Sequence, residues 1–92
     1  NYYEGNFKKA VKCYEKVITL SPESPDSYFN LGITYLEQGE NTKAAEYFEK
    51  VISMDLKYVD AYINLGTTYN NIGQKEKAIE CYEKVLQIDS NN

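Results

Sequence analysis

Hydrophobic residues recur along the chain at spacings of three and four, which is the period of one face of an α-helix. Two successive stripes near the middle follow this spacing: Tyr28, Leu31, Gly32 and Tyr35, and then Ala44, Phe48 and Val51. β-branched runs with a period of two are absent, so strands are not expected. The pattern predicts an all-α chain with helices over residues 7–20, 26–38, 41–54, 60–72 and 75–88.

The helical pattern repeats along the chain with a fixed period. Glycines at positions 5, 39 and 73 are evenly spaced, and the Ala, aromatic and Val positions of the second stripe keep the same spacing. Aligned in this register, residues 25–58 and 59–92 share 15 identical residues. Each unit therefore reads as two amphipathic helices, with a glycine that can take positive φ after the first of them.

This pattern resembles the tetratricopeptide repeat, in which an aromatic residue, a Leu-Gly pair, a Tyr, an Ala and a second aromatic residue recur within each unit. Tyr28 and Tyr62 stand where that family often has Trp, and Pro22 matches its closing proline. Leu56 and Ser90 replace that proline in the other two units. Because proline there only sharpens the stop between units, we expect softer junctions that remain helical.

The resemblance implies an α-α solenoid, which is a right-handed superhelix of helical hairpins with about two and a half repeats. Residues 1–24 would form a partial unit, with residues 1–4 as the tail of a truncated first helix, and residues 25–58 and 59–92 would be full units. The sequence starts with Asn1 inside a helical pattern, so we interpret the chain as a section of a longer array. In this family the first helix of each unit lines a long concave face.

Charge and composition narrow the partners of such a fold. The 92 residues include 10 Lys and 14 acidic residues but no Arg, His or Trp, and the formal net charge is −4. Neutralising phosphates needs a basic footprint, so we expect no nucleic-acid partner. No apolar run approaches the roughly 20 residues of a membrane span, so no membrane partner is expected either.

The first helix of each full unit should present a polar stripe to the concave face. Its hydrophobic stripe points into the stack, so the opposite stripe is the predicted peptide-binding surface. The residues of this surface are Asp26, Phe29, Asn30, Ile33 and Glu37 in one unit and Asp60, Ile63, Asn64, Thr67 and Asn71 in the next.

Asn30 and Asn64 each stand just before a Leu-Gly pair, at the same position of successive repeats. A carboxamide offers one acceptor and two donors, so it can pair with both the C=O and the N–H of a peptide unit. The two residues resemble the asparagine ladder of the O-GlcNAc transferase superhelix, which implies a grip on an extended backbone. Asn is also common at this place in the family, and the alternative is a solvated polar face with another binding mode.

Asp26 and Asp60 form a second column with two interpretations. They can pair with basic or hydroxyl groups of a ligand, or they can stabilise the starts of their helices by capping and through the helix dipole. Chaperone-binding members of the family clamp a C-terminal dicarboxylate with Lys, Arg and Asn, whereas this stripe contains Asn but no Lys. We therefore expect a neutral or basic protein or peptide as the partner.

The final helix should carry an exposed apolar strip. Ile79, Tyr82 and Leu86 share one face by their spacing of three and four, and no polar capping helix follows residue 88. Terminal repeats normally need a polar outer face for solubility. Self-association through this strip, giving a homo-oligomer, is therefore the alternative function.

Catalytic chemistry finds few candidates in the sequence. There is no His, no nucleophile beside a base and no G-x-G-x-x-G run, and carboxylates such as Glu46 have Lys three or four residues away, as on ordinary helix surfaces. Cys13 and Cys81 fall at the same place in two units, which favours two small apolar side chains over a disulfide or a metal pair. We expect no enzymatic activity, no cofactor and no metal site, and two reduced cysteines far apart.

Overall fold

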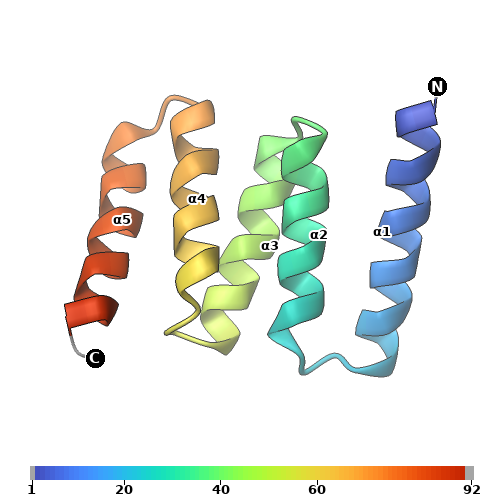
Figure 1. Cartoon of the computed structure of the whole chain (residues 1–92), viewed down its shortest axis with the longest axis horizontal. Helices are drawn as coiled ribbons and strands as arrows, with labels where there is room; N and C mark the ends of the chain where they lie inside the picture. The colour runs from blue at the N-terminus through green and yellow to red at the C-terminus, as the bar shows by residue number, and fades with distance from the viewer. Residues whose placement is uncertain (1, 91–92) are drawn as a thin grey trace.

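The structure, a computed structural model, describes residues 2–90, which fold into five helices joined by short turns. The helices are α1 (Tyr2–Leu20), α2 (Pro25–Glu37), α3 (Asn41–Met54), α4 (Val59–Asn71) and α5 (Lys75–Ser90). They stand antiparallel in a row, and the molecule measures 40 × 30 × 16 Å (Figure 1). The all-α fold that the hydrophobic pattern predicts and the solenoid that the family resemblance implies are both confirmed.

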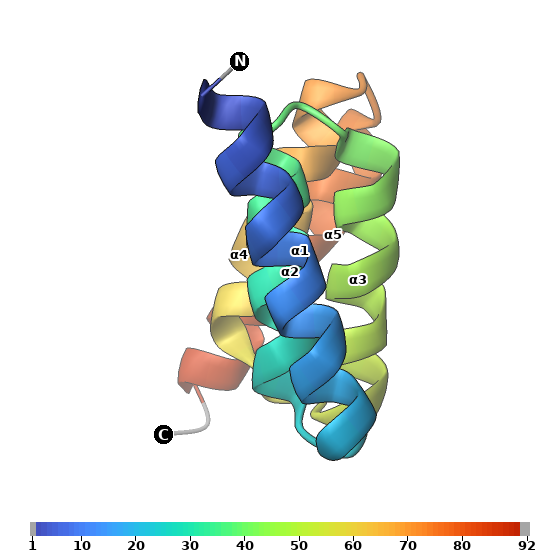
Figure 2. The same ribbon diagram turned by 90° about the vertical axis from the view of Figure 1, so that its right-hand side faces the viewer.

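The helices form two layers, and neighbouring helices lie closer together in one layer than in the other. α2 and α4 lie in one layer, and α3 and α5 lie in the other (Figure 2). Each helix packs against the next one, and α2 also contacts α4, whereas within residues 2–90 no Cα atoms of α3 and α5 come within 8 Å of one another. The row of helices therefore curves so that α2 and α4 lie on the inner side of the curve. The surface of α2 and α4 that faces away from α3 and α5 is the concave side.

Two glycine turns reverse the chain in the same way. Gly39 and Gly73 both have a φ of +78°, a conformation that glycine adopts readily because it lacks a Cβ atom. The N–H of Glu40 donates to the carbonyl oxygen of Tyr35 at 2.9 Å, and the equivalent bond in the next repeat has the same length. These turns end α2 and α4 and set the next helix beside each of them.

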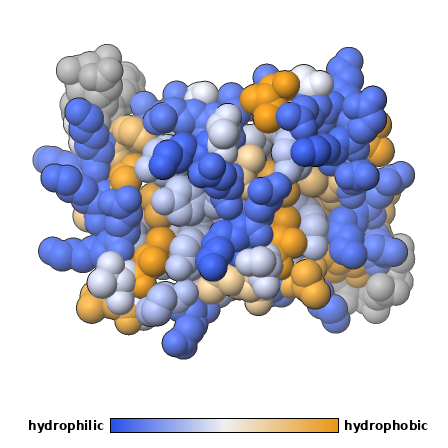
Figure 3. Space-filling view, turned by 180° about the vertical axis from the view of Figure 1, so that it is seen from behind, coloured by the Kyte–Doolittle hydropathy of each residue, from blue (hydrophilic) through white to orange (hydrophobic). Residues whose placement is uncertain are grey.

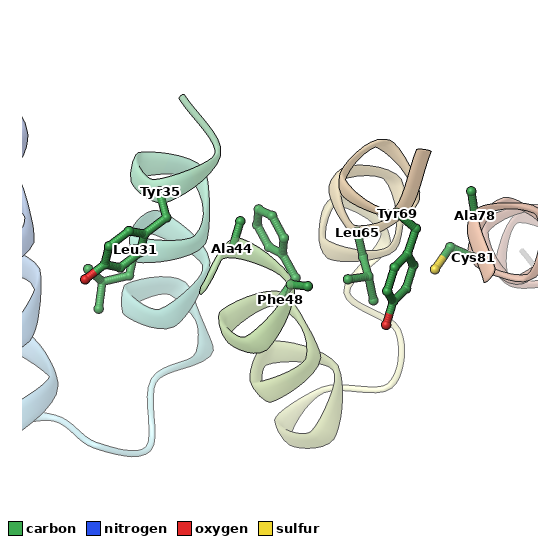
Figure 4. Packing of buried hydrophobic residues seen from close by; sticks show 9 residues of the cluster. Leu31, Tyr35, Ala44, Phe48, Leu65, Tyr69, Ala78 and Cys81 are labelled. Atoms are coloured by element: carbon green, nitrogen blue, oxygen red, sulfur yellow. The ribbon is translucent and has the colours of Figure 1, made fainter. Parts of the chain in front are cut away.

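The core lies between the two layers and contains the stripes predicted from the sequence (Figure 4). Leu31, Ala44 and Phe48 have no exposed surface at all. A Cβ atom added at Gly32 would lie only 2.6 Å from Cε1 of Phe48. Gly32 therefore leaves the space that the Phe48 ring occupies, and α2 and α3 can pack closely.

The expected start of the first helix is wrong. α1 begins at Tyr2 and passes through Gly5, so residues 2–4 belong to the same helix as the residues that follow and do not end an earlier one. Among the described residues, positive φ occurs only at Gly39 and Gly73. Those two glycines join paired helices, whereas Gly5 lies within one continuous helix.

The expected helical junction at Leu56 is also wrong. Residues 55–58 form a turn like the one around Pro22, and α4 starts only at Val59. The Asp55 side chain stabilises this turn, because its Oδ1 accepts a hydrogen bond from the Lys57 backbone N–H at 3.0 Å. The Asp55 side chain thus stabilises the end of a unit that has Leu56 at the position of the family's proline. The third junction, after Ser90, lies outside the described residues.

Candidate protein-binding surface

The ten predicted peptide-binding residues all lie on the inner helices α2 and α4, and we call them the groove residues. Seven of the ten are exposed, whereas Phe29, Ile33 and Asn64 are half-buried. In contrast, Leu31, Leu65 and their neighbours on the opposite stripe are buried in the core. The two helices therefore divide into a core face and an accessible face.

Two of the hydrophobic groove residues contribute to the core as well. The Phe29 ring lies 5.7 Å from the ring of Phe48 and 5.2 Å from that of Tyr58, measured between centroids. Ile33 also packs against the core cluster. Ile63, which is the equivalent of Phe29 in the next unit, is 40% exposed. A ligand would therefore meet the edges of Phe29 and Ile33 but a larger part of Ile63.

The asparagine column consists of carboxamides that do not use all of their hydrogen-bonding groups within the described residues. Asn64 Nδ2 donates to the carbonyl oxygen of Asp60, one turn earlier on α4, at 2.8 Å. That bond uses one of the two N–H donors, so the carboxamide retains a donor and an acceptor for a peptide group. Asn30 is exposed on α2 at the equivalent position.

The aspartate column includes a link from α2 to Tyr58, the residue just before α4. Asp26 Oδ1 accepts a hydrogen bond from the Tyr58 hydroxyl at 2.5 Å. Burial raises the pKa of Tyr58 to about 12, with a further contribution from this hydrogen bond. The hydroxyl is therefore protonated at neutral pH and remains a donor. Sequence reasoning missed Tyr58, because its equivalents in the flanking units are Ser24 and Asn92.

Asp26 and Asp60 lie in the first turns of their helices, where the helix dipole favours a carboxylate. The N-cap positions themselves belong to Ser24 and Tyr58. The dipole part of the capping interpretation thus fits the geometry, and it leaves the Asp60 carboxylate exposed toward the concave side. The two aspartates differ in that Asp26 already accepts a hydrogen bond from Tyr58.

Two of the remaining groove residues, Glu37 and Asn71, are the last residues of α2 and α4. Asn71 Nδ2 donates to Asn41 Oδ1 at 3.1 Å, which joins the end of α4 to the start of α3. Glu37 lines a cavity of about 320 Å³ between α1 and α2, together with Tyr14 and Thr34. Thr67 is exposed, and its hydroxyl donates to the carbonyl oxygen of Ile63 at 3.2 Å.

The three residues predicted for self-association have different environments. Ile79 and Leu86 are 55% and 66% exposed. Tyr82 is half-buried, because its ring fills the space above Gly66, where an added Cβ atom would lie 2.6 Å from Cε1 of the ring. Its hydroxyl is 3.4 Å from Thr67 Oγ1 on α4. The exposed apolar strip of α5 therefore consists of Ile79 and Leu86.

Cys13 and Cys81 are both free thiols, but their environments differ. Cys13 is exposed on α1, whereas Cys81 is buried where α5 packs on α4. Burial raises the pKa of the Cys81 thiol, and the carboxylates of Glu80 and Glu49 raise it further. None of the helices within residues 2–90 has the length and hydrophobicity that crossing a membrane requires.

Several solved structures share this arrangement of helices. A crystal structure of MamA has a TM-score of 0.90 and 28% sequence identity over 99% of this chain and 53% of the MamA chain. The Sgt2 TPR domain from Aspergillus fumigatus gives 0.86 and 28% over 96% of this chain and 58% of that chain. The first TPR of Spaghetti (RPAP3), solved with the HSP90 peptide SRMEEVD, gives 0.87 and 24% over 99% and 72%. The chain thus spans about half the length of the MamA structure.

The family comparison concerns the sequence itself. No curated protein sequence matches the chain significantly. Residues 1–39 match a family model described as TPR repeat, and residues 25–58 and 59–92 each match the model described as Tetratricopeptide repeat. The same repeat model thus matches twice in succession, and the chain folds as consecutive helical hairpins. This protein therefore belongs to the tetratricopeptide repeat family.

Proposed function

We propose that this protein is an interaction scaffold whose concave side, formed by α2 and α4, holds an extended peptide or partner segment. The observation that carries the proposal is the register of the groove residues. Asn30 and Asn64 stand at equivalent positions on two inner helices that contact each other, with polar atoms accessible in both units. A column of carboxamides suits a peptide backbone, because each one can satisfy a peptide C=O and N–H. RPAP3, which has the same fold, was solved holding a peptide.

The charge of the concave side favours a neutral or basic partner. Neither α2 nor α4 contains a Lys, while Asp26, Glu37 and Asp60 place carboxylates on these two helices. A peptide that ends in acidic residues, such as the SRMEEVD bound by RPAP3, would meet like charges on α2 and α4. We therefore propose a different partner chemistry for this chain, in which the ligand carries Lys or Arg beside a stretch of exposed backbone.

Removing both carboxamides should weaken ligand binding without unfolding the protein. For a labelled, Lys-containing peptide selected by display on the native chain, Asn30→Ala combined with Asn64→Ala should reduce affinity about thirtyfold. That estimate assumes one backbone hydrogen bond lost at each Asn and roughly 1 kcal/mol for each bond. Fluorescence anisotropy measures the affinity, and circular dichroism should remain unchanged because both side chains lie outside the core.

Gln87→Ala is the matched control for that experiment, since Gln87 carries the same carboxamide on exposed α5. It should leave the affinity unchanged. Equal losses from Gln87→Ala and from the double variant would contradict the groove assignment. So would tight binding of SRMEEVD that the double variant does not alter.

A second candidate function is self-association through α5, which the exposure of Ile79 and Leu86 favours. Burying these side chains against another copy would remove apolar surface from water. Ile79→Lys combined with Leu86→Lys should therefore shift the sedimentation of the chain to that of a monomer at unchanged helix content. The control Gln87→Lys adds a charge on the same helix and should keep the oligomer. A native chain that sediments as a monomer at high concentration excludes this function.

A further inference from the structure

A cavity of about 420 Å³ lies between α3 and α5, with α4 as its floor. Its apolar walls are Ile52 from α3, Tyr62, Leu65 and Tyr69 from α4, and Cys81 from α5. Figure 4 shows the Cys81 thiol beside the Tyr69 ring, with Leu65 on the other side of that ring. None of the groove residues lines this cavity, so it is separate from the concave surface. Its volume falls within the usual range of ligand pockets, roughly 300–1,000 Å³.

The first hairpin holds an aromatic ring at the equivalent place. Tyr47 occupies the position in its repeat that Cys81 occupies in the next one. Its ring stacks on Tyr35, with centroids 5.5 Å apart and planes 8° from parallel. It also lies 6.5 Å from the ring of Tyr28. A tyrosine from α3 is therefore held against two tyrosines of α2.

The second hairpin keeps the walls of this arrangement without the ring. Tyr62 and Tyr69 are the equivalents of Tyr28 and Tyr35. Lys77 Nζ lies 5.4 Å from the Tyr69 centroid, as Lys43 Nζ lies 5.8 Å from that of Tyr35. The Tyr69 hydroxyl also donates a hydrogen bond to Glu49 of α3, which fixes the orientation of the ring. Cysteine in place of tyrosine thus leaves open a space whose surroundings suit an aromatic ring.

We propose that this cavity is a docking pocket for one aromatic side chain, a tyrosine or phenylalanine, of a partner protein. Offset stacking on Tyr69 would stabilise such a ring beyond the burial of its area. The charges of the side chains that line the cavity balance, because there are two lysines, Lys77 and Lys84, and two glutamates, Glu49 and Glu80. This balance favours a neutral ligand over an ionic one. All of the lining residues in the described chain belong to α3, α4 and α5.

The pocket opens on the side of α3 and α5, opposite the concave surface. Seen from that side, hydrophilic side chains cover most of the molecule, and hydrophobic residues show between them (Figure 3). If an aromatic side chain of a partner protein enters the pocket, the rest of the partner stays outside, next to the charged residues around the opening. This proposal does not depend on ligand binding by the groove residues. Neither Asn30 nor Asn64 lines the pocket, so replacing both with alanine would leave the pocket unchanged.

The two cysteines provide a direct test. Cys81 lines the pocket and is 8% exposed, whereas Cys13 is exposed on α1. The experiment treats the native chain with iodoacetamide and measures the alkylation rate of each thiol. Mass spectrometry of the two cysteine-containing peptides gives these rates. p-Cresol, the analogue of a tyrosine side chain, should slow the alkylation of Cys81 several-fold and leave that of Cys13 unchanged. The peptide acetyl-Gly-Tyr-Gly-amide should act in the same way.

Two variants separate the pocket from general stabilisation of the fold. Tyr47→Cys removes the ring from the first hairpin and should create a second pocket, so p-cresol should protect the introduced thiol as well. Cys81→Tyr fills the natural pocket and should remove the rise in melting temperature that p-cresol gives the native chain. If Cys81→Tyr fails to fold, the Tyr47→Cys experiment still decides.

Three results would overturn the proposal. Equal protection by 4-methylcyclohexanol, which has similar size and no aromatic ring, would show that the pocket accepts any apolar group. Protection by p-cresol without protection by the tyrosine peptide would assign the pocket to small aromatic molecules and not to a partner protein. Unchanged alkylation of Cys81 in the presence of both probes would show that no ring enters.

Discussion

Replacing Phe48 with alanine should lower the free energy of unfolding by about 3–5 kcal/mol, the usual range for deleting a buried aromatic side chain. Phe48 has no exposed surface, and its ring lies over Gly32 of α2 and near the ring of Phe29. The space it leaves is bounded by helices that other contacts hold in place, so the cavity can collapse only partly. Urea unfolding followed by circular dichroism measures the change.

Tyr82→Ala is the matched comparison, since Tyr82 is the equivalent of Phe48 in the next repeat and lies over Gly66 in the same way. Tyr82 is half-buried and has exposed atoms in the native state, so less contact is lost when it is removed. Tyr82→Ala should therefore lower the free energy of unfolding clearly less than Phe48→Ala does. The reverse order would show that the centre of the core is not at α3.

A single methyl group at position 32 should also destabilise the protein strongly. In Gly32→Ala the new Cβ atom would lie 2.6 Å from Cε1 of Phe48, which is far closer than atoms in contact. Because Phe48 is enclosed on all sides, either its ring or the distance between α2 and α3 must change. We expect a loss of about 1–3 kcal/mol, the typical effect of overpacking.

The overlap can be tested by a double-mutant cycle. Phe48→Leu shortens the opposing side chain, so Gly32→Ala should lose less stability in that background than in the native one. Gly66→Ala is the second control, because its Cβ atom would approach the half-buried Tyr82 ring, which has room to move. Simple additivity in the cycle, or equal losses at both glycines, would disprove the proposed clash.

The repeat made most of the fold predictable. Period and register alone place Leu31, Ala44 and Phe48 in the core and predict the positive φ at Gly39 and Gly73, because these features depend on local helix geometry. The start of α1 was not predictable in the same way. Gly5 keeps the register of the other glycines, yet it lies within the continuous helix α1.

Contacts between residues far apart in the sequence were less accessible from the sequence alone. The bond from Tyr58 to Asp26 joins residues 32 apart, and Tyr58 has no aromatic equivalent in the other units. The pocket at Cys81 was different, because the sequence does contain a signal that points to it. Alignment of the units places Cys81 opposite Tyr47, and a small residue opposite a ring indicates a space. Only coordinates show that neighbouring side chains leave that space open.

The range of the side-chain contacts limits how this protein can change in length. Long-range side-chain hydrogen bonds join residues at fixed offsets, such as 20 from Glu49 to Tyr69, 30 from Asn41 to Asn71 and 32 from Asp26 to Tyr58. Losing one residue within a helix would rotate everything beyond it by about 100° and separate these partners. Adding one whole repeat unit before or after the existing units preserves every offset. Duplication of complete units is therefore the route of growth in evolution that the packing tolerates.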